Sequence, residues 1–334
     1  MAKFIVKRLL LAIVILFFVM FLIYTLIYVI PSNYVETTAR ELASATAKLP
    51  GGKTYDQWLE QLNKDTGRDK GLVVGYFTWI GNAVRGNFGE SWKWNMSCTK
   101  KFSSVIWNSF ALGLISFIFE IIIAIPLGVI AAKKQYSITD YTVTCIALIG
   151  ISLPTFFVAT VLKLVFAIKL KWFDIGGMHS RDFISTKATQ WEAFWDVAWH
   201  FVLPAMTLIF ISIGGLMRYT RTNMLEVLNA DYIRTARAKG LPERKVIGYH
   251  AFRNTLIPIV TLLGGTLPGL FSGALITETL FSIDGIGYIS YYSMTSGDIP
   301  FTMFYLTLMS ILTLLGNIIA DILYAVVDPR VRVN

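Results

Sequence analysis

The chain has 334 residues, of which 55% are hydrophobic and 15% charged, and its 30 Lys and Arg against 21 Asp and Glu give a formal net charge of +9 at pH 7. With a mean hydropathy of +0.59, a soluble globule would carry more apolar side chains than it could bury, so the composition predicts a membrane protein. The basic residues occupy short loops on one predicted side of the bilayer and form no stripe with stacking aromatics, which excludes a nucleic-acid-binding protein.

Cysteine and histidine usage argues against a covalent framework and a metal centre. Cys98 and Cys145 are too few and too differently placed for a disulfide framework, and Cys145 is interpreted as a small core residue. His179, His200 and His250 are scattered and lack the spacing of metal ligands. We therefore expect no metal site.

The N-terminal segment predicts a membrane span. Residues 9–30 form an unbroken apolar run that is long enough to cross about 30 Å of hydrocarbon, and three basic residues precede it. A cleaved signal peptide is the alternative, but it would have a shorter apolar core and a small-residue cleavage site, which residues 30–32 do not provide. We expect residues 1–30 to be a cytosolic N-terminus and a retained first span.

The next segment, residues 31–101, is polar and mixed in charge, and it predicts an extracellular domain with a short helix over 55–63. Its aromatic and Gly-rich stretch 76–94 is typical of an ordered cap at the membrane interface. Simple anchoring by tryptophans and contact with a substrate are both open interpretations of that stretch.

Residues 102–329 predict a transmembrane core. The expected spans cover residues 105–132, 141–168, 200–217, 255–280 and 301–327. The first of these is followed by Lys133 and Lys134, the second carries Pro154 in its middle, and the third continues as a helix past the bilayer. Together with the N-terminal span they make six crossings, without a convincing internal repeat.

Charge asymmetry sets the predicted orientation. Residues 218–254 contain eight Lys or Arg against three acids, which is the strongest cytosolic signal in the chain. No Lys or Arg lies between Arg253 and Arg330. Arg330 and Arg332 then place the C-terminal tail, residues 330–334, in the cytosol. Both termini are therefore expected to be cytosolic.

The cytosolic loop 227–254 predicts a helical hairpin. Residues 231–239 favour a helix because they contain no Gly or Pro, and Asp231 or Asn229 is expected to cap it. Gly240 should end that helix in the left-handed conformation, and Pro242 suits the first turn of a second helix that enters the membrane. The corner carries basic side chains (Arg234, Arg237 and Lys239) and side chains with apolar surface to bury (Tyr232, Ala236 and Leu241). This pattern indicates a knob presented to a partner protein.

Proline and glycine interrupt several spans. The residues concerned are Pro126, Pro154, Pro204, Pro258, Pro268, Gly264, Gly265, Gly269 and Gly273. Because a broken helix cannot expose unpaired backbone groups to lipid, such helices line a water-filled cavity or a helix interface. Close packing through small residues is the alternative to a moving pathway.

Glu120 is the ionisable residue that the span boundaries place near mid-membrane, where an unpaired charge costs at least ~2.5 kcal/mol. It should be protonated, paired or facing a cavity. Lys163 is the nearest opposite charge by span, but we favour outward snorkelling over direct pairing. The candidate pathway or gating residues are Glu120, Pro154, Gly264, Gly265, Gly269 and Glu278.

The sequence contains no arrangement typical of catalysis. It has no nucleophile with a base, no paired carboxylates at a plausible site and no Gly-rich phosphate loop ending in Lys-Ser/Thr. Uphill transport would therefore draw its energy from another subunit or from an ion gradient. We expect a transport subunit and not an enzyme.

Several segments resemble one family of transporters. The hairpin sequence DYIRTARAKGL resembles the cytosolic EAA loop of binding-protein-dependent ABC importer permeases, in the oligopeptide/dipeptide/nickel branch. The segments that agree with the same branch are RGNFGESW, IPLGVIAA, ISLPTFFVA, ITETLFSIDGIG and DILYAVVDPRVR. Thr235, Ala236 and Arg237 stand for the leading Glu-Ala-Ala, Asp284 stands where Pro is usual, and Asn87 replaces a common Asp.

The resemblance implies an all-α polytopic membrane protein of the bacterial plasma membrane, with six transmembrane helices in the type I ABC importer permease fold and an extracellular insertion after the first helix. The short helix would dock into a groove on an ATP-hydrolysing subunit. The coupling residues that it implies are Tyr232, Arg234, Thr235, Ala236, Arg237, Ala238, Lys239, Gly240 and Leu241.

The resemblance also implies partners. These are a second, similar permease as heterodimer partner, two ATPase subunits that bind ATP and Mg, and an extracellular binding protein, with no cofactor in this chain. Oligopeptides or dipeptides are the favoured substrates, with nickel or oligosaccharides as alternatives in the same family. An ion-coupled secondary transporter is the rival from another class, and a membrane scaffold would leave the broken spans unexplained.

Overall fold

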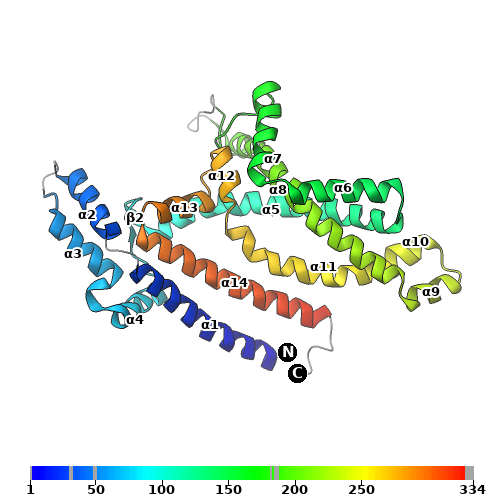
Figure 1. The fold of residues 1–334 in the computed structure, drawn as a ribbon, viewed down its shortest axis with the longest axis horizontal. Coiled ribbons are helices and arrows are strands. Elements are labelled where there is room, and N and C mark those ends of the chain that lie inside the picture. Colours follow the sequence, from blue (N-terminus) through cyan, green and yellow to red (C-terminus); the bar gives the residue numbers. More distant parts are fainter. Residues whose placement is uncertain (1, 30–32, 48–50, 181–182, 184–187, 328–334) are drawn as a thin grey trace. The chain divides into compact units, whose positions relative to one another are not determined.

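The computed structural model describes residues 2–29, 33–47, 51–180, 183 and 188–327 (Figure 1). These residues form helices and an antiparallel pair of two-residue strands, β1 (Glu90–Ser91) and β2 (Met96–Ser97), in which Glu90 pairs with Ser97. The predicted all-α class is therefore confirmed. The predicted C-terminal tail, with Arg330 and Arg332, lies outside the described residues.

The apolar runs of the sequence become membrane-length helices, because a helix satisfies all its backbone hydrogen bonds internally. Within the described chain, five stretches are long and apolar enough to cross a bilayer, and they are Ile5–Val29, Cys98–Lys133, Gln190–Leu228, Glu243–Phe271 and Ile299–Ile322. The corresponding helices are α1 (Ala2–Val29), α5 (Cys98–Lys133), α8 (Gln190–Leu228), α10 (Glu243–Lys245) with α11 (Phe252–Thr266), and α14 (Ile299–Val327). A bent pair, α6 (Ile138–Ser152) with α7 (Thr155–Leu162), gives the sixth span if it is counted as one, so the chain is a multi-pass membrane protein.

The predicted third span is not one helix. α6 (Ile138–Ser152) stops at Leu153, whose backbone is extended at φ −84° and ψ 133°, and α7 (Thr155–Leu162) starts after Pro154. α7 continues into a π-helical turn, Lys163–Lys169, and the two halves of the pair are bent by 104°. Pro154 causes the break, because it lacks a backbone N–H and disfavours the helical conformation of the residue before it.

The predicted fifth span over 255–280 is shifted toward the N-terminus, because the structure has this apolar stretch at Glu243–Phe271. A π-helical turn, Val246–Ala251, precedes α11, and a 3₁₀ turn, Leu267–Phe271, follows it. Gly273 then takes a positive φ of 77°, which ends the helical run before α12 (Leu275–Phe281) begins. Apolar composition alone did not reveal this interruption.

The chain divides into two compact units. The first contains Met1–Trp107 with Ile286–Ile318, and the second contains Asn108–Gly285 with Ile319–Asn334. We call them the N-terminal unit and the core unit. The remaining helices of the N-terminal unit are α2 (Asn33–Thr46), α3 (Tyr55–Thr66), a 3₁₀ turn (Arg68–Lys70), α4 (Leu72–Val84) and α13 (Ile286–Thr295).

Aromatic side chains build the interior of the N-terminal unit. Tyr24 and Tyr76 are buried, and their hydroxyls donate to the carbonyl oxygens of Thr66 at 3.0 Å and Phe17 at 2.8 Å. The helix predicted over 55–63 is confirmed and runs on to Thr66 as α3. It ends at Gly67, which has a φ of 69° and whose N–H donates to Lys64 O.

A buried carboxylate joins the strand pair to the start of α14. Asp298 is 1% exposed, and it accepts hydrogen bonds from the Ser91 hydroxyl and from the backbone N–H groups of Trp92 and Lys93. Burial raises the pKa of Asp298, while these hydrogen bonds act in the opposite direction. The predicted aromatic cap is thus an ordered piece of this unit.

Candidate functional site

The hairpin predicted to be cytosolic begins where α8 ends. α9 (Asp231–Ala238) follows after the N-cap residue Ala230, and no side chain caps it. The predicted capping is wrong, because Asn229 donates its side-chain amide back to Leu225 O at 3.0 Å and so completes the end of α8. Asp231 lies in the first turn of α9, where its negative charge complements the helix dipole.

The corner of the hairpin forms as predicted. Gly240 has a φ of 74°, and its N–H donates to Arg237 O at 2.9 Å. Pro242 is the N-cap of the next short helix, α10. A left-handed residue after the helix and a proline soon after it are the stop signals that the sequence displays.

The hairpin is seated on its own unit through one apolar face. Ile233 is fully buried and Ala236 is 7% exposed, and they belong to a cluster with Met224 of α8 and with Val246 and Ala251 of the π-helical turn. Ala236, assigned from the resemblance to a docking position, therefore faces its own chain. Residues three apart share a helix face, and this spacing was the signal by which Ile233 could have been found.

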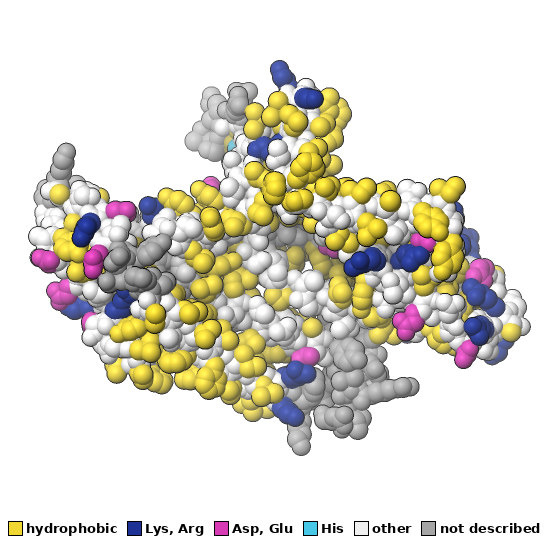
Figure 2. Space-filling view, viewed as in Figure 1, with side chains coloured by type: hydrophobic (Ala, Val, Ile, Leu, Met, Phe, Trp, Pro, Cys, Tyr) yellow, Lys and Arg dark blue, Asp and Glu magenta, His cyan; other side chains and the backbone are white. Residues whose placement is uncertain are grey.

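The opposite face of α9 is open. Its exposed residues are Asp231, Tyr232, Arg234, Thr235, Arg237 and Ala238, and the exposed corner adds Lys239 and Gly240, whereas Leu241 is half-buried. Tyr232 leaves 48% of its surface exposed, so its ring is presented and not packed in this chain. Figure 2 shows Lys and Arg side chains over the tip made by α9 and α10, at the right of the view.

One basic residue of this face is oriented by an ion pair. The guanidinium of Arg237 donates to both carboxylate oxygens of Glu243, from Nη2 at 2.8 Å and from Nε at 3.2 Å. This hydrogen bonding with Glu243 raises the pKa of Arg237. The pair ties α9 to α10 across the corner, and it leaves Arg237 43% exposed.

We expect Gly240→Ala to destabilise the corner by about 1–2 kcal/mol through backbone strain alone, since a left-handed conformation costs an L-residue that much. A Cβ at Gly240 would meet nothing within 4 Å, so no clash contributes. Thermal unfolding of the solubilised protein measures the effect. Gly265→Ala is the control, because that glycine also faces open space but lies in α11 without a positive φ. Equal melting of the two variants would contradict the assignment.

The intramembrane candidates do not converge on one site. Glu120 of α5 has the Ser212 side chain of α8 as a hydrogen-bonding neighbour. Lys163 donates its ammonium to Leu280 O and lies 5.5 Å from the centre of the Phe281 ring. Glu120 and Lys163 are therefore not paired in this structure. Lys163 binds the last turn of α12 instead of snorkelling outward as predicted.

Glu278 of α12 is the buried anchor of its segment. It is 0% exposed, and one carboxylate oxygen accepts from the Ser109 hydroxyl at 2.7 Å and from Ala274 N at 2.9 Å. Glu278 is one of the predicted pathway residues, and in this structure its side chain is enclosed. The turn after α12 packs directly against the Glu278 carboxylate, because a Cβ added at Gly285 would lie 2.3 Å from the carboxyl carbon of Glu278.

The remaining candidates differ in their surroundings. Pro154 lies in the break between α6 and α7, and Gly264 is buried in α11. Gly265 and Gly269 face open space. Cys145, predicted as a core residue, is exposed on α6. Within the described residues, no three His, Cys, Asp or Glu side chains are grouped to hold a metal.

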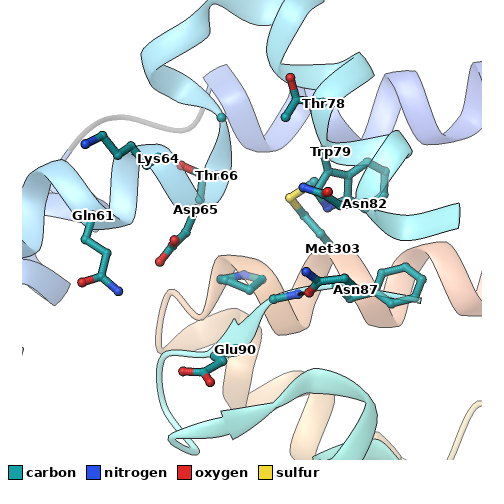
Figure 3. A pocket seen from close by; sticks show the side chains of 14 residues that line it. Gln61, Lys64, Asp65, Thr66, Thr78, Trp79, Asn82, Asn87, Glu90 and Met303 are labelled. Atoms are coloured by element: carbon teal, nitrogen blue, oxygen red, sulfur yellow. Dashed lines mark hydrogen bonds between the residues drawn. The ribbon is translucent and has the colours of Figure 1, made fainter. Parts of the chain in front are cut away.

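The N-terminal unit contains a polar cavity of about 330 Å³ (Figure 3). Its polar lining includes Gln61 and Asp65 of α3, Thr78 and Asn82 of α4, and Asn87 and Glu90 before and in β1. Partial burial raises the pKa of Asp65, Lys53 lowers it, and the nearby charge of Glu90 raises it. Sequence reasoning missed this cavity, because its walls come from four separate segments.

Comparison with known proteins gives a consistent result. The family model described as "Binding-protein-dependent transport system inner membrane component" matches residues 124–333, and the model for the N-terminal part of such membrane components matches residues 1–104. The oligopeptide transport system permease protein AppB of Bacillus subtilis is 38% identical over 274 residues, covering 82% of this chain and 84% of that protein. The di/tripeptide transport system permease protein DppB of Pseudomonas aeruginosa is 34% identical over 343 residues, covering 99% of each chain.

Proposed function

The chain belongs to the family of binding-protein-dependent transport system inner membrane components, and on that premise we propose that it is the translocation subunit of an ATP-driven importer of oligopeptides or dipeptides. The relatives that support the substrate class are named for oligopeptide and di/tripeptide transport. Nickel or oligosaccharide import is the alternative within the family, and ion-coupled transport is the alternative outside it.

The observation that carries the proposal is the seated hairpin. α9 is fastened to its own unit by Ile233 and Ala236, while its other face exposes Tyr232 and a set of basic side chains. A short helix that is rigidly held and open on one side can receive force from a partner and pass it to the helix before it. An ATPase surface with an acidic rim and an apolar slot would complement Arg234 and Tyr232.

The proposed assembly has four further members. Two ATPase subunits bind ATP and Mg and grip the hairpins, a second permease completes the pathway as a heterodimer, and an extracellular binding protein delivers the peptide. The exposed residues 232, 234, 235 and 237–240 are the contact residues that we assign to the ATPase. Ion-coupled transport makes a different prediction, since uptake would then survive deletion of the ATPases.

Charge reversal at Arg237 tests the contact. We expect Arg237→Glu to weaken co-purification of the ATPase at least tenfold while membrane insertion stays normal, because the residue is exposed and its loss leaves the Ile233 seat intact. Glu243→Gln is the matched control, since it breaks the same ion pair without changing the exposed positive charge. Unchanged co-purification of Arg237→Glu, or equal loss in both variants, would defeat the assignment.

Orientation of the hairpin is tested by labelling. A cysteine at Ala238, in a Cys145→Ser background, is expected to stay unreacted when intact cells receive a membrane-impermeant thiol reagent. Cys98 is buried, and a cysteine at the exposed Arg85 of the N-terminal unit should react, which makes it the positive control. Labelling at position 238 from outside would overturn both the topology and the mechanism.

A further inference from the structure

Close helix packing joins α8 to α6 in the core unit. The backbone of Gly214 lies against Ala147, where an added Cβ would come within 2.4 Å of the carbonyl oxygen. Gly150 of α6 lies in the same way against Phe210 of α8, at 2.6 Å from its carbonyl oxygen. Since the contact positions rise along one helix as they fall along the other, the two helices run antiparallel.

A bidentate ion pair fastens the same two helices at the end nearest the hairpin. Arg221 of α8 donates from Nε to Asp140 Oδ1 at 2.6 Å and from Nη2 to Oδ2 at 2.7 Å. The Asp140 side chain is 3% exposed and also accepts from Tyr136 N at 2.9 Å. Paired N–H groups of arginine on a carboxylate fix orientation as well as distance.

The far end of α6 lies at the break before α7. α6 meets α7 at Leu153 and Pro154 with a 104° bend. An apolar cavity of about 210 Å³ lies at this point, lined by Leu153, Phe157, Val158, Val161, Leu162, Met206 and Phe210. Because densely packed interiors resist deformation, a cavity beside the bend lets α7 shift without compressing its neighbours.

We propose that α6 and α8 form one lever that carries displacement of α9 to the bend at Pro154, and that Asp140 and Arg221 are the positioning residues which fasten it. This inference rests on the proposed function, because it assumes that an ATPase displaces α9. α8 is continuous over 39 residues, two residues separate it from α9, and its Met224 packs in one cluster with Ile233 of α9, so displacement of α9 is passed on to α8. The ion pair between Arg221 and Asp140 makes α6 move with α8.

Loss of the Arg221–Asp140 ion pair is predicted to impair coupling between ATP hydrolysis and import without impairing assembly of the complex. In the complete complex in nanodiscs, Arg221→Gln is expected to keep ATPase co-purification and ATP hydrolysis, while the ATP hydrolysed per peptide imported rises at least tenfold. Arg221→Lys, which keeps the charge but not the fork, should recover part of the coupling. Arg218→Gln, an exposed arginine on the same helix, is the matched control and should behave as wild type.

A second measurement separates the lever from simple structural support. A complex with cysteines at positions 140 and 221, in the Cys145→Ser background, is expected to hydrolyse ATP without importing peptide. Import should return once a short bis-maleimide joins the two cysteines. A joined form that stays inactive, or an Arg221→Gln complex that stays coupled, would overturn the inference. If the wild-type complex itself imports no peptide, the proposed function fails instead.

Discussion

Gly285→Ala is expected to lower the thermal midpoint of the solubilised protein by more than any other single methyl addition discussed above. Its Cβ would lie 2.3 Å from the carboxyl carbon of Glu278 and 2.5 and 2.6 Å from the two oxygens. Overpacking costs about 1–3 kcal/mol, and moving the carboxylate away from Ser109 and Ala274 N breaks two buried hydrogen bonds to a charged group, which adds about 1–3 kcal/mol. Thermal unfolding with and without bilayer lipid measures the loss.

Removing the Glu278 carboxylate should relieve the clash with the new methyl group. Glu278→Ala removes the carboxylate that the new methyl would strike, so the double variant Gly285→Ala/Glu278→Ala should be less destabilised than the two single effects added together. Gly265→Ala supplies the control for a glycine in open space. A Gly285→Ala protein that melts like wild type would show that the turn after α12 does not press on Glu278.

Ile233→Asp is expected to detach α9 and to abolish ATPase association. The side chain is fully buried among Met224, Val246 and Ala251, where an unpaired carboxylate costs several kcal/mol. α9 has eight residues, and a helix that short does not persist without tertiary packing. We therefore expect the tip to unfold while the membrane spans stay in place.

Limited proteolysis reports this detachment. Trypsin should cut Ile233→Asp within residues 234–245 far faster than wild type, because the arginines and lysines there lose their folded backbone. Tyr232→Asp is the matched control, since Tyr232 is next to Ile233 in the chain, is 48% exposed and tolerates a charge. Ile233→Val should cost only about 0.5–1.5 kcal/mol. Wild-type resistance to trypsin in Ile233→Asp would refute the seating of α9.

Local chemistry made several features predictable. The apolar runs foretold the long helices, and Gly240 with Pro242 foretold the corner, because conformational restriction of these residues acts within a few positions. The agreement of short segments with the permease branch foretold the family, which the comparisons confirm. The extracellular and cytosolic assignments and the coupling residues remain predictions.

Other features depended on which face of a helix was covered. Tyr232 and Ile233 are adjacent side chains, and the packing of α9 on the π-helical turn encloses Ile233 while Tyr232 stays open. The sequence predicts a core position for Cys145, whereas the structure exposes it on α6. Pro154 was visible as a breaker in the sequence, but the 104° bend between α6 and α7 was not.

By itself the sequence determined that this protein crosses a membrane, that Gly240 and Pro242 form a corner, and to which family the chain belongs, because hydrophobic length and backbone restriction are properties of neighbouring residues. Only the tertiary structure decided the pairs that hold the core unit together. Asp140 meets Arg221 across 81 positions, and Ser109 meets Glu278 across 169. Such partners are selected by the packing of whole helices, and no pattern in either segment specifies the other.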